Sequence, residues 1–529
     1  GVGIGETAKS DAAKPVVKKK DPKKSTRLPP EYRKNFKLEP EKPGKAAEPP
    51  PRDERLPSLD LLAKEKGSRP DERTINQTAG MIEKTLAEFG LPVKVIGFQV
   101  GPTVTQFAVE PGYVDKPGQD DDGQRQKVRV SQISSLAKDL ALALEAERLR
   151  VQAPVPGRPY VGIEIPNPRS SIVRLRPILE SEEFFKTSSP LAVALGRNVS
   201  GEAVVADLTR MPHLLIAGAT GSGKSICISA LTTCLVMNNT PEDLRLVMVD
   251  PKMVEMVRFN GLPHIIGKVE TELERMLAVL RWTVAEMDRR YKVLEKAGVR
   301  DIDTYNKKMR RSKNGEVMPR LVTLIDELAD LMMISSDQTE QSLVRLAQMG
   351  RATGIHLVLA TQRPSTDVVT GLIKANFPAR ISFAVASSID SRVILDVHGA
   401  ESLLGKGDML YLPPEAGNPF RVQGVMVDER EVDQVIDYWQ TTWEAREQEE
   451  EVPWADISIS DGEDDDGLIE DAIDIVRKTG RASASMLQRR LRVGYPRAAR
   501  LVDQLEDLGV VGPSLGPGKE REVLIEEEE

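Results

Sequence analysis

Apolar positions between residues 190 and 430 fall into short continuous runs, separated by longer stretches of helical periodicity. Runs of four to six apolar residues are typical of strands that are covered on both faces of a parallel sheet. They lie at residues 214–217, 244–249, 321–325, 356–360 and 380–385. The two longest helical stretches cover residues 271–296 and 331–348. This alternation predicts a doubly wound α/β domain, which we place at residues 186–436.

The segment before this domain has a different pattern. Apolar residues first recur at helical spacing, at Ile75, Ala79, Ile82, Leu86 and Phe89. Two strands are predicted over residues 93–98 and 103–109, followed by a helix over 133–147 and short strands near 150–152 and 160–166. This order predicts a small α+β domain over residues 71–185, and no set of catalytic residues is visible in it.

Two segments have no apolar periodicity. Residues 1–70 are rich in Lys, Pro and Glu, and residues 437–466 carry acidic runs. Such segments cannot bury enough apolar surface to offset the entropy lost on ordering. We therefore predict a disordered basic, proline-rich linker over residues 1–70 and an acidic linker over 437–466. The alternative for the first is an arm that binds a membrane surface or nucleic acid.

Composition narrows the class of protein. The 529 residues carry a formal net charge of −8, which excludes a wholly basic nucleic-acid coat but not a local basic face. Two cysteines exclude a disulfide-built secreted scaffold and favour a cytoplasmic location. No apolar run approaches the roughly 18 residues of a membrane helix. Because the chain begins with Gly1 and shows no signal peptide, we expect a processed or truncated piece of a longer protein.

One motif predicts nucleotide binding. It is Gly218-Ala219-Thr220-Gly221-Ser222-Gly223-Lys224-Ser225, which matches G-x-x-x-x-G-K-[ST]. Its glycines let backbone N–H groups turn inward around phosphate oxygens, and the following helix adds its N-terminal dipole. Lys224 can reach the β- and γ-phosphates, and the Ser225 hydroxyl can hold Mg²⁺. Since an apolar strand precedes the motif and an apolar helix begins at Ile226, residues 218–226 predict a site for ATP and Mg²⁺.

A pair of carboxylates follows the apolar run at residues 321–325. Asp326 is positioned to hold Mg²⁺ through water, and Glu327 to polarise the attacking water as a general base. The alternative is a strand that ends in a solvated acidic turn. With a phosphate-binding loop about a hundred residues upstream, we favour the catalytic interpretation.

Other polar residues follow predicted strands. Gln362 comes at the carboxyl end of a strand that we expect beside the strand of the phosphate-binding loop, where it could sense the γ-phosphate. The alternative for Gln362 is a polar strand cap. Asp250 also ends a strand, but the pattern assigns it no role. Arginines that could act on a neighbour's nucleotide are numerous, and spacing alone does not choose among Arg345, Arg351, Arg363, Arg380 and Arg392.

The last 60 residues contain a local basic cluster. Residues 477–502 carry eight Lys or Arg and no acidic residue, which is typical of a surface that binds a polyanion. Helices are predicted over 468–478, 483–491 and 496–508, followed by a β-hairpin. This order predicts a winged helix over residues 467–529 with its recognition helix in the DNA major groove. Arg489, Arg497, Arg500 and Asp503 are the candidate DNA contacts, and the alternative is a winged helix used for protein contacts.

Taken together, these motifs resemble the FtsK/SpoIIIE family of bacterial DNA translocases. The resemblance covers residues 75–525 and extends well beyond the phosphate-binding loop. It includes Asp250-Pro251-Lys252, Pro263-His264, Arg281-Trp282 and the segments at 286–291, 354–357, 360–365, 371–376, 389–392 and 407–411.

The resemblance implies three modules, named α, β and γ, with a RecA-like fold in β and a homohexameric ring around double-stranded DNA. It implies that Arg351 acts in trans on a neighbour's nucleotide, with Arg380 second, and that Arg363, Lys374 and Arg392 face DNA in the pore. It also implies that γ reads short polar sequences that orient the motor and can activate Xer recombinase.

Two departures from the family pattern are visible. Family members usually carry an N-terminal membrane anchor that is absent from this sequence, which either a missing N-terminal part or a naturally soluble paralogue would explain. In γ, the family's Gly-Tyr-Asn-Arg-Ala-Ala-Arg appears with Pro496 in place of Asn. Asn can contact a base edge and Pro cannot donate a hydrogen bond, so the orienting sequence is left open.

We therefore expect an ATP-driven double-stranded DNA translocase that acts in chromosome segregation during cell division or sporulation. Two alternative functions fit the same motifs. One is another ring motor of the same superfamily, such as a conjugative coupling protein or a secretion ATPase. The other is a DNA-binding regulator whose nucleotide site is only a switch.

Overall fold

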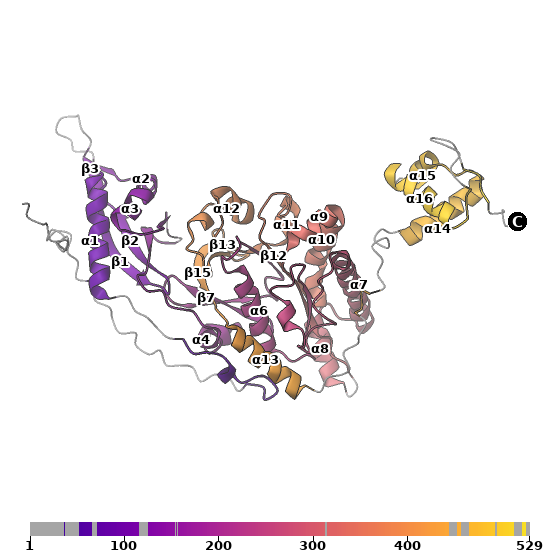
Figure 1. Ribbon diagram of the computed structural model, residues 1–529, viewed down its shortest axis with the longest axis horizontal. Helices are drawn as coiled ribbons and strands as arrows, with labels where there is room; N and C mark the ends of the chain where they lie inside the picture. Colours follow the sequence, from indigo (N-terminus) through magenta and orange to yellow (C-terminus); the bar gives the residue numbers. More distant parts are fainter. Residues whose placement is uncertain are drawn as a thin grey trace, which may run out of the picture. The chain divides into compact units, whose positions relative to one another are not determined.

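The computed structural model describes residue 36 and residues 52–65, 71–115, 125–153, 155, 157–312, 315–443, 452–455, 465–491, 495–512 and 521–524. These residues divide into two compact units (Figure 1). The first is built from Ser68–Val100 and Val104–Ser170, and the second from residues 52–65, Gly101–Thr103 and the chain from Ser171 onward. The remaining residues of the two predicted linkers lie outside this description.

The first unit is an α+β domain. Its antiparallel sheet has the order β1 (Val93–Val100), β2 (Val104–Pro111), β6 (Val161–Pro166), β5 (Arg150–Gln152). Helix α1 (Glu72–Glu88) contributes to the core the apolar residues whose spacing predicted it, including Ile75, Ile82 and Leu86. The helix predicted over residues 133–147 is instead two short helices, α2 (Val130–Ser135) and α3 (Ala137–Ala143). A small hairpin of β3 (Tyr113–Asp115) and β4 (Arg125–Lys127) completes the unit.

The second unit contains a nine-stranded sheet. Its five parallel strands are, in order, β10 (Leu244–Val249), β11 (Arg320–Ile325), β12 (Ile355–Thr361), β9 (His213–Ala217) and β13 (Ala379–Phe383). Four antiparallel strands extend it on the β13 side, in the order β14 (Asp408–Leu412), β15 (Phe420–Gly424), β7 (Ala192–Asn198) and β8 (Ala203–Asp207). The five strands predicted from apolar runs are therefore confirmed.

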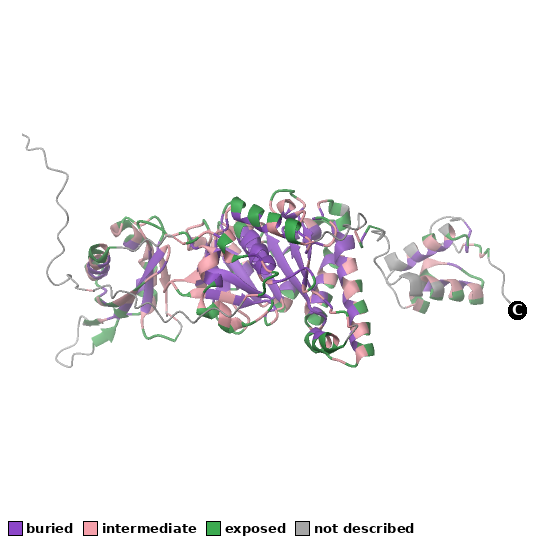
Figure 2. Cartoon of the chain, turned by 90° about the horizontal axis from the view of Figure 1, so that it is seen from below, coloured by how far each residue is buried: buried purple, intermediate pink, exposed green. Residues whose placement is uncertain are grey.

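Both faces of this sheet are covered, which explains the continuous apolar runs. Along β11, Val322 and Leu324 join a core with α6 (Lys224–Asn238) and α13 (Glu429–Thr442), while Leu321 and Ile325 join a second core. That second core includes α7 (Leu273–Ala297), α9 (Leu328–Ile334) and α10 (Ser336–Thr353). Figure 2 shows the buried strands enclosed by helices with exposed outer faces.

The shorter helices of this unit lie mainly beside strand ends. They are α4 (Leu175–Leu179), α5 (Glu182–Thr187), α8 (Ile302–Arg311), α11 (Gly371–Asn376) and α12 (Ser388–Leu395). Single 3-10 turns occur at Leu59–Leu61, Val257–Phe259 and Ala400–Ser402. None of the helices in the described ranges is both long and apolar enough to cross a membrane.

The strand order places the chemistry at one edge of the sheet. Strand β12 lies between β9, which leads into the phosphate-binding loop, and β11, which leads into Asp326. Because the three strands are parallel, their carboxyl ends meet at the same edge. This arrangement confirms the RecA-like P-loop fold that the resemblance implies.

The predicted domain boundaries need three corrections. Residues 52–65, predicted as linker, pack on the second unit, where Leu62 is buried and the Ala63 N–H donates to Glu431 Oε1 at 2.7 Å. Residues 171–185, predicted within the α+β domain, belong to the second unit, because Leu175 and Ile178 are buried in its core. The acidic linker does not begin at residue 437, because α13 continues to Thr442.

Two buried tryptophans show why residues 437–443 and 452–455 are not part of a linker. Trp439, on α13, is fully buried and donates its indole N–H to the carbonyl of Val236 at 3.1 Å. Trp454 is buried against Trp282, with ring centroids 5.4 Å apart, and donates to Glu270 Oε2 at 2.9 Å. Residues 437–443 and 452–455 therefore pack as part of the second unit.

The C-terminal residues form the predicted winged-helix domain. Helices α14 (Asp465–Thr479), α15 (Ala484–Leu491) and α16 (Tyr495–Asp507) enclose a core that includes Val476, Leu487 and Leu505. Backbone bridges join Ala482 to Arg521 and Val511 to Val523, so the two arms of the wing pair as predicted. The tip of the wing, residues 513–520, lies outside the described residues.

Candidate active site

The phosphate-binding loop needs glycine for two different reasons. A Cβ on Gly218 would lie 2.6 Å from the Phe383 Cβ, so no side chain fits there. Gly223 has φ +120°, and a Cβ on it would lie 2.6 Å from the backbone nitrogen of Gly407. The Gly407 N–H donates to the Ser222 carbonyl at 2.9 Å, which ties the loop to the segment before β14. The backbone from Gly218 to Gly223 is thus held in a turn that leads directly into α6 at Lys224.

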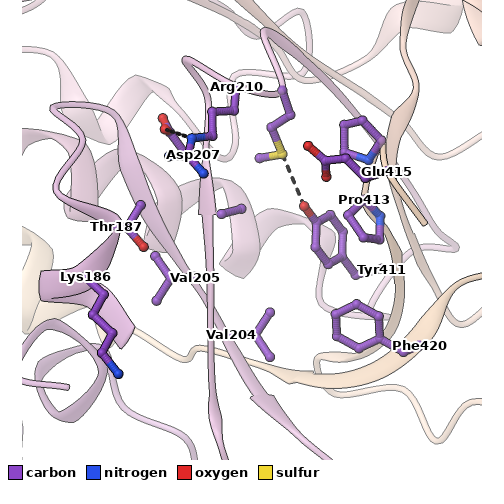
Figure 3. A pocket seen from close by; sticks show the side chains of 13 residues that line it. Lys186, Thr187, Val204, Val205, Asp207, Arg210, Tyr411, Pro413, Glu415 and Phe420 are labelled. Carbon is purple, nitrogen blue, oxygen red and sulfur yellow. Dashed lines mark hydrogen bonds and ion pairs between the residues drawn. The ribbon is translucent and has the colours of Figure 1, made fainter. Parts of the chain in front are cut away.

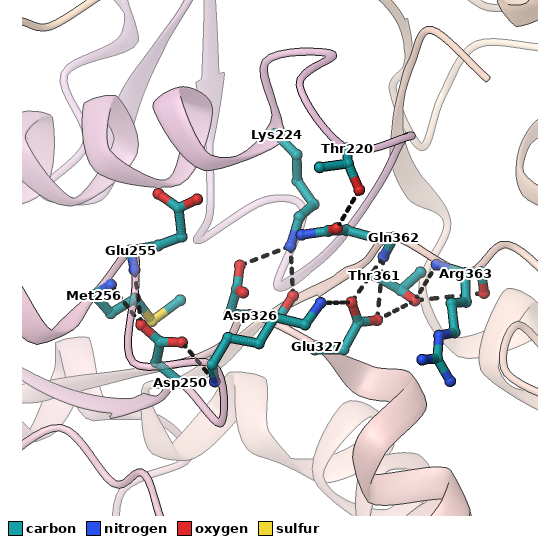
Figure 4. Close-up of polar contacts among 11 residues, drawn as sticks. Thr220, Lys224, Asp250, Glu255, Met256, Asp326, Glu327, Thr361, Gln362 and Arg363 are labelled. Atoms are coloured by element: carbon teal, nitrogen blue, oxygen red, sulfur yellow. Dashed lines mark hydrogen bonds and ion pairs between the residues drawn. The ribbon is translucent and has the colours of Figure 1, made fainter.

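Lys224 and Asp326 form a buried ion pair. Lys224 Nζ lies 2.7 Å from Asp326 Oδ1 and 2.6 Å from the main-chain oxygen of Asp326. Their side chains are 2% and 0% exposed. Figure 4 shows Lys224 reaching from the start of α6 to the end of β11. Lys224 and Asp326, which were predicted from two separate motifs, are therefore in direct contact.

The residues present fit a hydrated Mg²⁺. Asp326 Oδ2 is buried and has no hydrogen-bond partner among the described residues, so one carboxylate oxygen is free for a further ligand. Ser225, half-buried on the first turn of α6, supplies a hydroxyl next to Lys224. No cluster of three or more His, Cys, Asp or Glu side chains in the described ranges could hold a metal alone. The donor set therefore matches an ion that keeps waters and takes substrate phosphate oxygens as ligands.

Three donors hold the carboxylate of Glu327. Lys252 Nζ lies 2.7 Å from Oε2, Thr361 Oγ1 donates to Oε1 at 2.6 Å, and the Gln362 N–H lies 3.1 and 3.2 Å from the two oxygens. Burial of the side chain acts to raise the pKa of Glu327, but the hydrogen bonds from Lys252 and Thr361 outweigh it and lower the pKa below its ordinary value. Glu327 is therefore ionised at neutral pH, as a general base must be.

Gln362 joins this network to the phosphate-binding loop. Its Oε1 accepts a hydrogen bond from Thr220 Oγ1 at 2.7 Å, while its backbone N–H contacts Glu327. Figure 4 shows the two contacts on opposite sides of the residue. Gln362 thus lies between the phosphate-binding loop and Glu327.

Sequence reasoning missed the role of Lys252. Asp250 directly follows β10 at the same edge of the sheet, and its carboxylate accepts from the N–H groups of Lys252, Glu255 and Met256 at 3.2, 2.9 and 2.8 Å. This fixes the short loop from which Lys252 reaches Glu327 (Figure 4). A lysine three residues after the end of β10, at the edge where Asp326 and Glu327 lie, was the available signal.

The candidate trans-acting arginines differ in their surroundings. Arg351 is exposed on the last turn of α10, next to the amino end of β12. Arg380 is buried and donates to Phe377, Ile394, Lys374 and Asp396. Arg345 pairs with Asp288 at 2.9 Å. Arg380 therefore has a structural role in this arrangement, whereas Arg351 is accessible.

The residues predicted to face DNA in the pore follow consecutive strands. Arg363 is exposed just after β12, and Arg392 is exposed on α12, which follows β13. Lys374, on α11, instead pairs with Asp396 at 2.7 Å, and its side chain is 24% exposed. Two of the three cations are thus presented to solvent, and the third is held by a carboxylate.

The winged-helix candidates are only partly described. Arg489 is exposed on α15. Asp503, on α16, forms an ion pair with Arg521 of the wing, which also pairs with Glu506. Arg497 and Arg500 lie on α16, but their side chains are outside the described set. Asp503 would have to leave Arg521 before it could contact a base.

A pocket of about 430 Å³ lies away from this site. Its walls come from β8, α5 and the β14–β15 segment, with Val204, Tyr411 and Phe420 among the lining residues (Figure 3). Asp207 and Arg210 lie at its side, 3.7 Å apart. Residues 218–226, Asp326 and Glu327 do not line it, so the pocket is separate from the candidate active site.

Family models match three stretches of the chain. The FtsK/SpoIIIE family model matches residues 174–366, the FtsK alpha domain model residues 56–167, and the FtsK gamma domain model residues 463–526. Together these stretches cover more than half of the chain.

Curated relatives agree with the family models. The chain is 46% identical over 484 residues to the DNA translocase SpoIIIE of Bacillus subtilis, an alignment that covers 90% of this chain and 60% of the relative. It is also 46% identical over 453 residues to a DNA translocase FtsK of Caldanaerobacter subterraneus, covering 86% of this chain and 61% of the relative. The chain thus spans about 60% of the length of these relatives.

A solved structure also aligns with the chain. It is the pCW3 conjugation coupling protein TcpA, at 22% identity and a TM-score of 0.47, with 68% of this chain and 99% of that one covered. The strand order of the second unit, rather than this alignment, defines the fold.

Proposed function

The chain belongs to the FtsK/SpoIIIE family, and we propose that it is an ATP-driven double-stranded DNA translocase that acts in chromosome segregation during cell division or sporulation. The observation that carries the ATPase part is the position of Glu327. This ionised carboxylate directly follows Asp326, the partner of Lys224, just after the end of β11. A site that only bound nucleotide would not need a general base there.

The proposed hydrolysis uses each of these residues in turn. Lys224 leaves Asp326 to contact the β- and γ-phosphates of ATP, while the backbone N–H groups of residues 218–226 surround the phosphate oxygens. Glu327 orients a water molecule and takes its proton as the water oxygen bonds to the γ-phosphorus, while the bond from the γ-phosphorus to the β–γ bridging oxygen breaks and ADP leaves. Mg²⁺, held by Ser225 and through water by Asp326, would neutralise the charge on the phosphates. Gln362 contacts both Thr220 and Glu327, which supports its role as the γ-phosphate sensor.

The position of Arg351 supports an oligomeric motor. It lies beside the amino end of β12, whereas the phosphate-binding loop lies at the carboxyl ends of the strands. A seven-residue strand spans roughly 23 Å, so Arg351 is too far to reach the nucleotide of its own chain. We propose that it acts in trans within a homohexameric ring around double-stranded DNA, where it would stabilise charge in the transition state.

The exposed cations Arg363 and Arg392 support a sequence-tolerant grip on DNA. A motor must step over every base, so its contacts should go to phosphates, which carry no sequence information. Lys374 could join them only by leaving Asp396. The winged-helix γ domain would supply the sequence reading that orients the motor, through Arg489, Arg497, Arg500 and Asp503.

Several further properties are proposed from the family alone. Activation of Xer recombinase through γ and anchoring to the membrane through an N-terminal part of a longer protein belong to this group. A cytoplasmic location of the motor fits with both.

Steady-state ATP hydrolysis with and without duplex DNA tests the proposal. We expect duplex DNA to accelerate hydrolysis at least about tenfold and to promote ring-sized assemblies in size measurements. Glu327→Gln should still bind ATP but hydrolyse it at least about a hundredfold more slowly, because general-base catalysis is worth about that much. Hydrolysis that proceeds at one rate regardless of DNA would instead favour a DNA-binding regulator with a nucleotide switch.

A further inference from the structure

Lys252 contacts the proposed general base directly. Its Nζ lies 2.7 Å from Glu327 Oε2, and its side chain is 38% exposed while that of Glu327 is 1% exposed. The pair thus joins a partly solvated lysine on a loop to a buried carboxylate on the sheet (Figure 4). Lys224 is engaged elsewhere, with Asp326, so the two lysines of the site hold the two adjacent carboxylates separately.

The loop that carries Lys252 is anchored at both ends and open between them. Asp250 and Met256 are fully buried, and Asp250 accepts the Met256 N–H at 2.8 Å. Between them, Met253 and Val254 are 62% and 66% exposed. Met253 has φ +55°, a left-handed conformation that costs a residue with a side chain about 1 kcal/mol or more. A strained, exposed loop between two fixed points can change its conformation without disturbing the sheet.

The other donors to Glu327 cannot move in this way. Thr361 Oγ1 and the Gln362 N–H belong to the end of β12, which pairs with both β9 and β11 inside the sheet. Among the described donors, Lys252 is therefore the one contact of the Glu327 carboxylate that comes from an exposed loop rather than from the end of a central strand. Each carboxylate oxygen offers about two acceptor sites and Lys252 takes one on Oε2, so release of Lys252 makes that site available to an attacking water molecule.

We propose that Lys252 is a positioning residue that restrains Glu327 until DNA is bound, and that it releases the carboxylate when its loop changes conformation during the DNA-stimulated cycle. The inference rests on the proposed ATPase function and adds to it the residue that keeps hydrolysis slow without DNA. In the Asp250-Pro251-Lys252 motif, Asp250 then fixes the conformation of the loop and Lys252 holds the Glu327 carboxylate.

The charged surroundings of Glu327 allow a readout specific to this contact. The groups that face it or its neighbours are Lys252 from the loop after β10, Asp326 on its own strand, Asp330 on α9 and Arg363 after β12. Of these, Lys252 is the cation bound to it. Loss of the Lys252 ammonium should therefore change kcat without DNA and leave KM for ATP unchanged, whereas Lys252→Arg, which keeps the charge, should preserve the wild-type rate.

The test compares full-length wild type with Lys252→Gln, Lys252→Arg and the control Lys292→Gln, which changes an exposed lysine on α7. We expect Lys252→Gln to raise the DNA-free kcat about tenfold, the effect of losing one charge-assisted hydrogen bond, with KM for ATP unchanged. The DNA-stimulated rate should change little, so the stimulation ratio falls. Lys252→Arg keeps a cationic donor and should stay within about threefold of wild type.

Two results would overturn the inference. A Lys252→Gln enzyme that loses activity equally with and without DNA would make Lys252 part of the chemistry rather than a restraint. An unchanged DNA-free rate in Lys252→Gln would make the ion pair merely structural. Both are distinct from failure of the proposed function, which would show as a wild-type enzyme that DNA does not stimulate. Equal melting temperatures for the variants and wild type exclude misfolding as the cause.

Discussion

Lys224 donates to both the side-chain and the main-chain oxygen of Asp326, at 2.7 and 2.6 Å, in a site that excludes solvent from both residues. The lysine that is proposed to hold phosphates therefore neutralises, in this arrangement, the carboxylate that is proposed to hold Mg²⁺. Binding of ATP with Mg²⁺ would replace one buried ion pair by two others, lysine with phosphate and carboxylate with the hydrated cation.

Lys224→Ala should abolish ATP hydrolysis and also lower stability. The substitution leaves the Asp326 carboxylate buried without its cation, and breaking a buried pair in this way costs about 3–5 kcal/mol. We expect a lower urea midpoint for the nucleotide-free protein together with loss of ATPase activity and of DNA movement.

The double variant Lys224→Ala with Asp326→Asn separates these two effects. It removes the unpaired charge, so much of the lost stability should return while activity stays absent. If Lys224→Ala still moved DNA, the proposed mechanism would be wrong. If it were as stable as wild type, the buried pair would contribute nothing to folding.

The fold could be predicted from sequence wherever apolar patterning and burial coincide. Five apolar runs became the five parallel strands, because strands covered on both faces must be apolar throughout. The two predicted linkers were too long, because some residues in them are buried without any local apolar pattern. Isolated anchors such as Leu62 and Trp454 pack against distant parts of the chain, and no local periodicity records such contacts.

In the candidate site too, residues within motifs could be predicted, whereas tertiary contacts could not. Lys224, Asp326 and Glu327 could be predicted because each lies in a motif whose spacing reflects its chemistry. Lys252 could not be assigned, because its contact with Glu327 depends on β10 lying beside β11, which only the strand order reveals. The engagement of Lys374 by Asp396 and of Asp503 by Arg521 is likewise a matter of tertiary contacts.

Trp454→Ala should destabilise the motor domain although the residue lies in a stretch whose sequence predicts a linker. The indole is 1% exposed, packs on Trp282 and donates to Glu270 Oε2. Truncating a buried tryptophan costs about 3–5 kcal/mol, whereas a change in a solvated linker costs less than about 0.5 kcal/mol. Urea unfolding of the full chain measures the difference.

Trp454→Phe is the matched control for this change. It keeps the aromatic contact with Trp282 and removes only the hydrogen bond to Glu270, which retains the N–H groups of Thr271 and Glu272. We expect a cost of about 1–2 kcal/mol. If Trp454→Ala left the free energy of unfolding unchanged, Trp454 would belong to a solvated linker, as the sequence predicts.

Three buried histidines should make the motor domain sensitive to mild acid. Burial lowers the pKa of His213 and of His264 to about 3 and that of His356 to about 4. Unfolded, each has a pKa near 6.5, so below that pH the unfolded chain binds protons that the folded chain excludes. The free energy of unfolding is therefore highest above pH 6.5 and falls as pH drops toward 4. At pH 5.5 the expected loss is about 1.4 kcal/mol for each histidine.

His356→Gln tests this pH dependence. Glutamine can still donate to the Pro212 carbonyl that His356 Nδ1 contacts at 3.2 Å, but it does not titrate. Urea unfolding of wild type and variant at pH 7.5 and 5.5 should show a smaller pH effect in the variant by about one third of the wild-type loss. Parallel pH dependences in the two proteins would mean that His356 is not held neutral by the fold.

Deletion of residues 465–529 should spare the motor and remove its direction. The C-terminal helices have their own core, built around residues such as Leu487 and Leu505, and Lys224, Asp326 and Glu327 lie beside the carboxyl ends of strands in the second unit's large sheet. DNA-stimulated ATP hydrolysis should therefore remain within about twofold of wild type. Sequence reading, in contrast, needs base-edge contacts, and the pore cations Arg363 and Arg392 are proposed to touch phosphates only.

Single-molecule tracking on a long duplex from the host chromosome measures the outcome, as the fraction of runs in each direction. Wild type should show a bias that the deletion reduces to equal fractions. Full-length protein with Arg497→Ala and Arg500→Ala is the finer control, because it keeps the domain and removes two cations of its third helix. It should lose the bias while its run speed stays unchanged, since speed depends on the ATPase site. A bias that survives both changes would place sequence reading outside the winged helix, and the pore residues would then have to contact bases as well as phosphates.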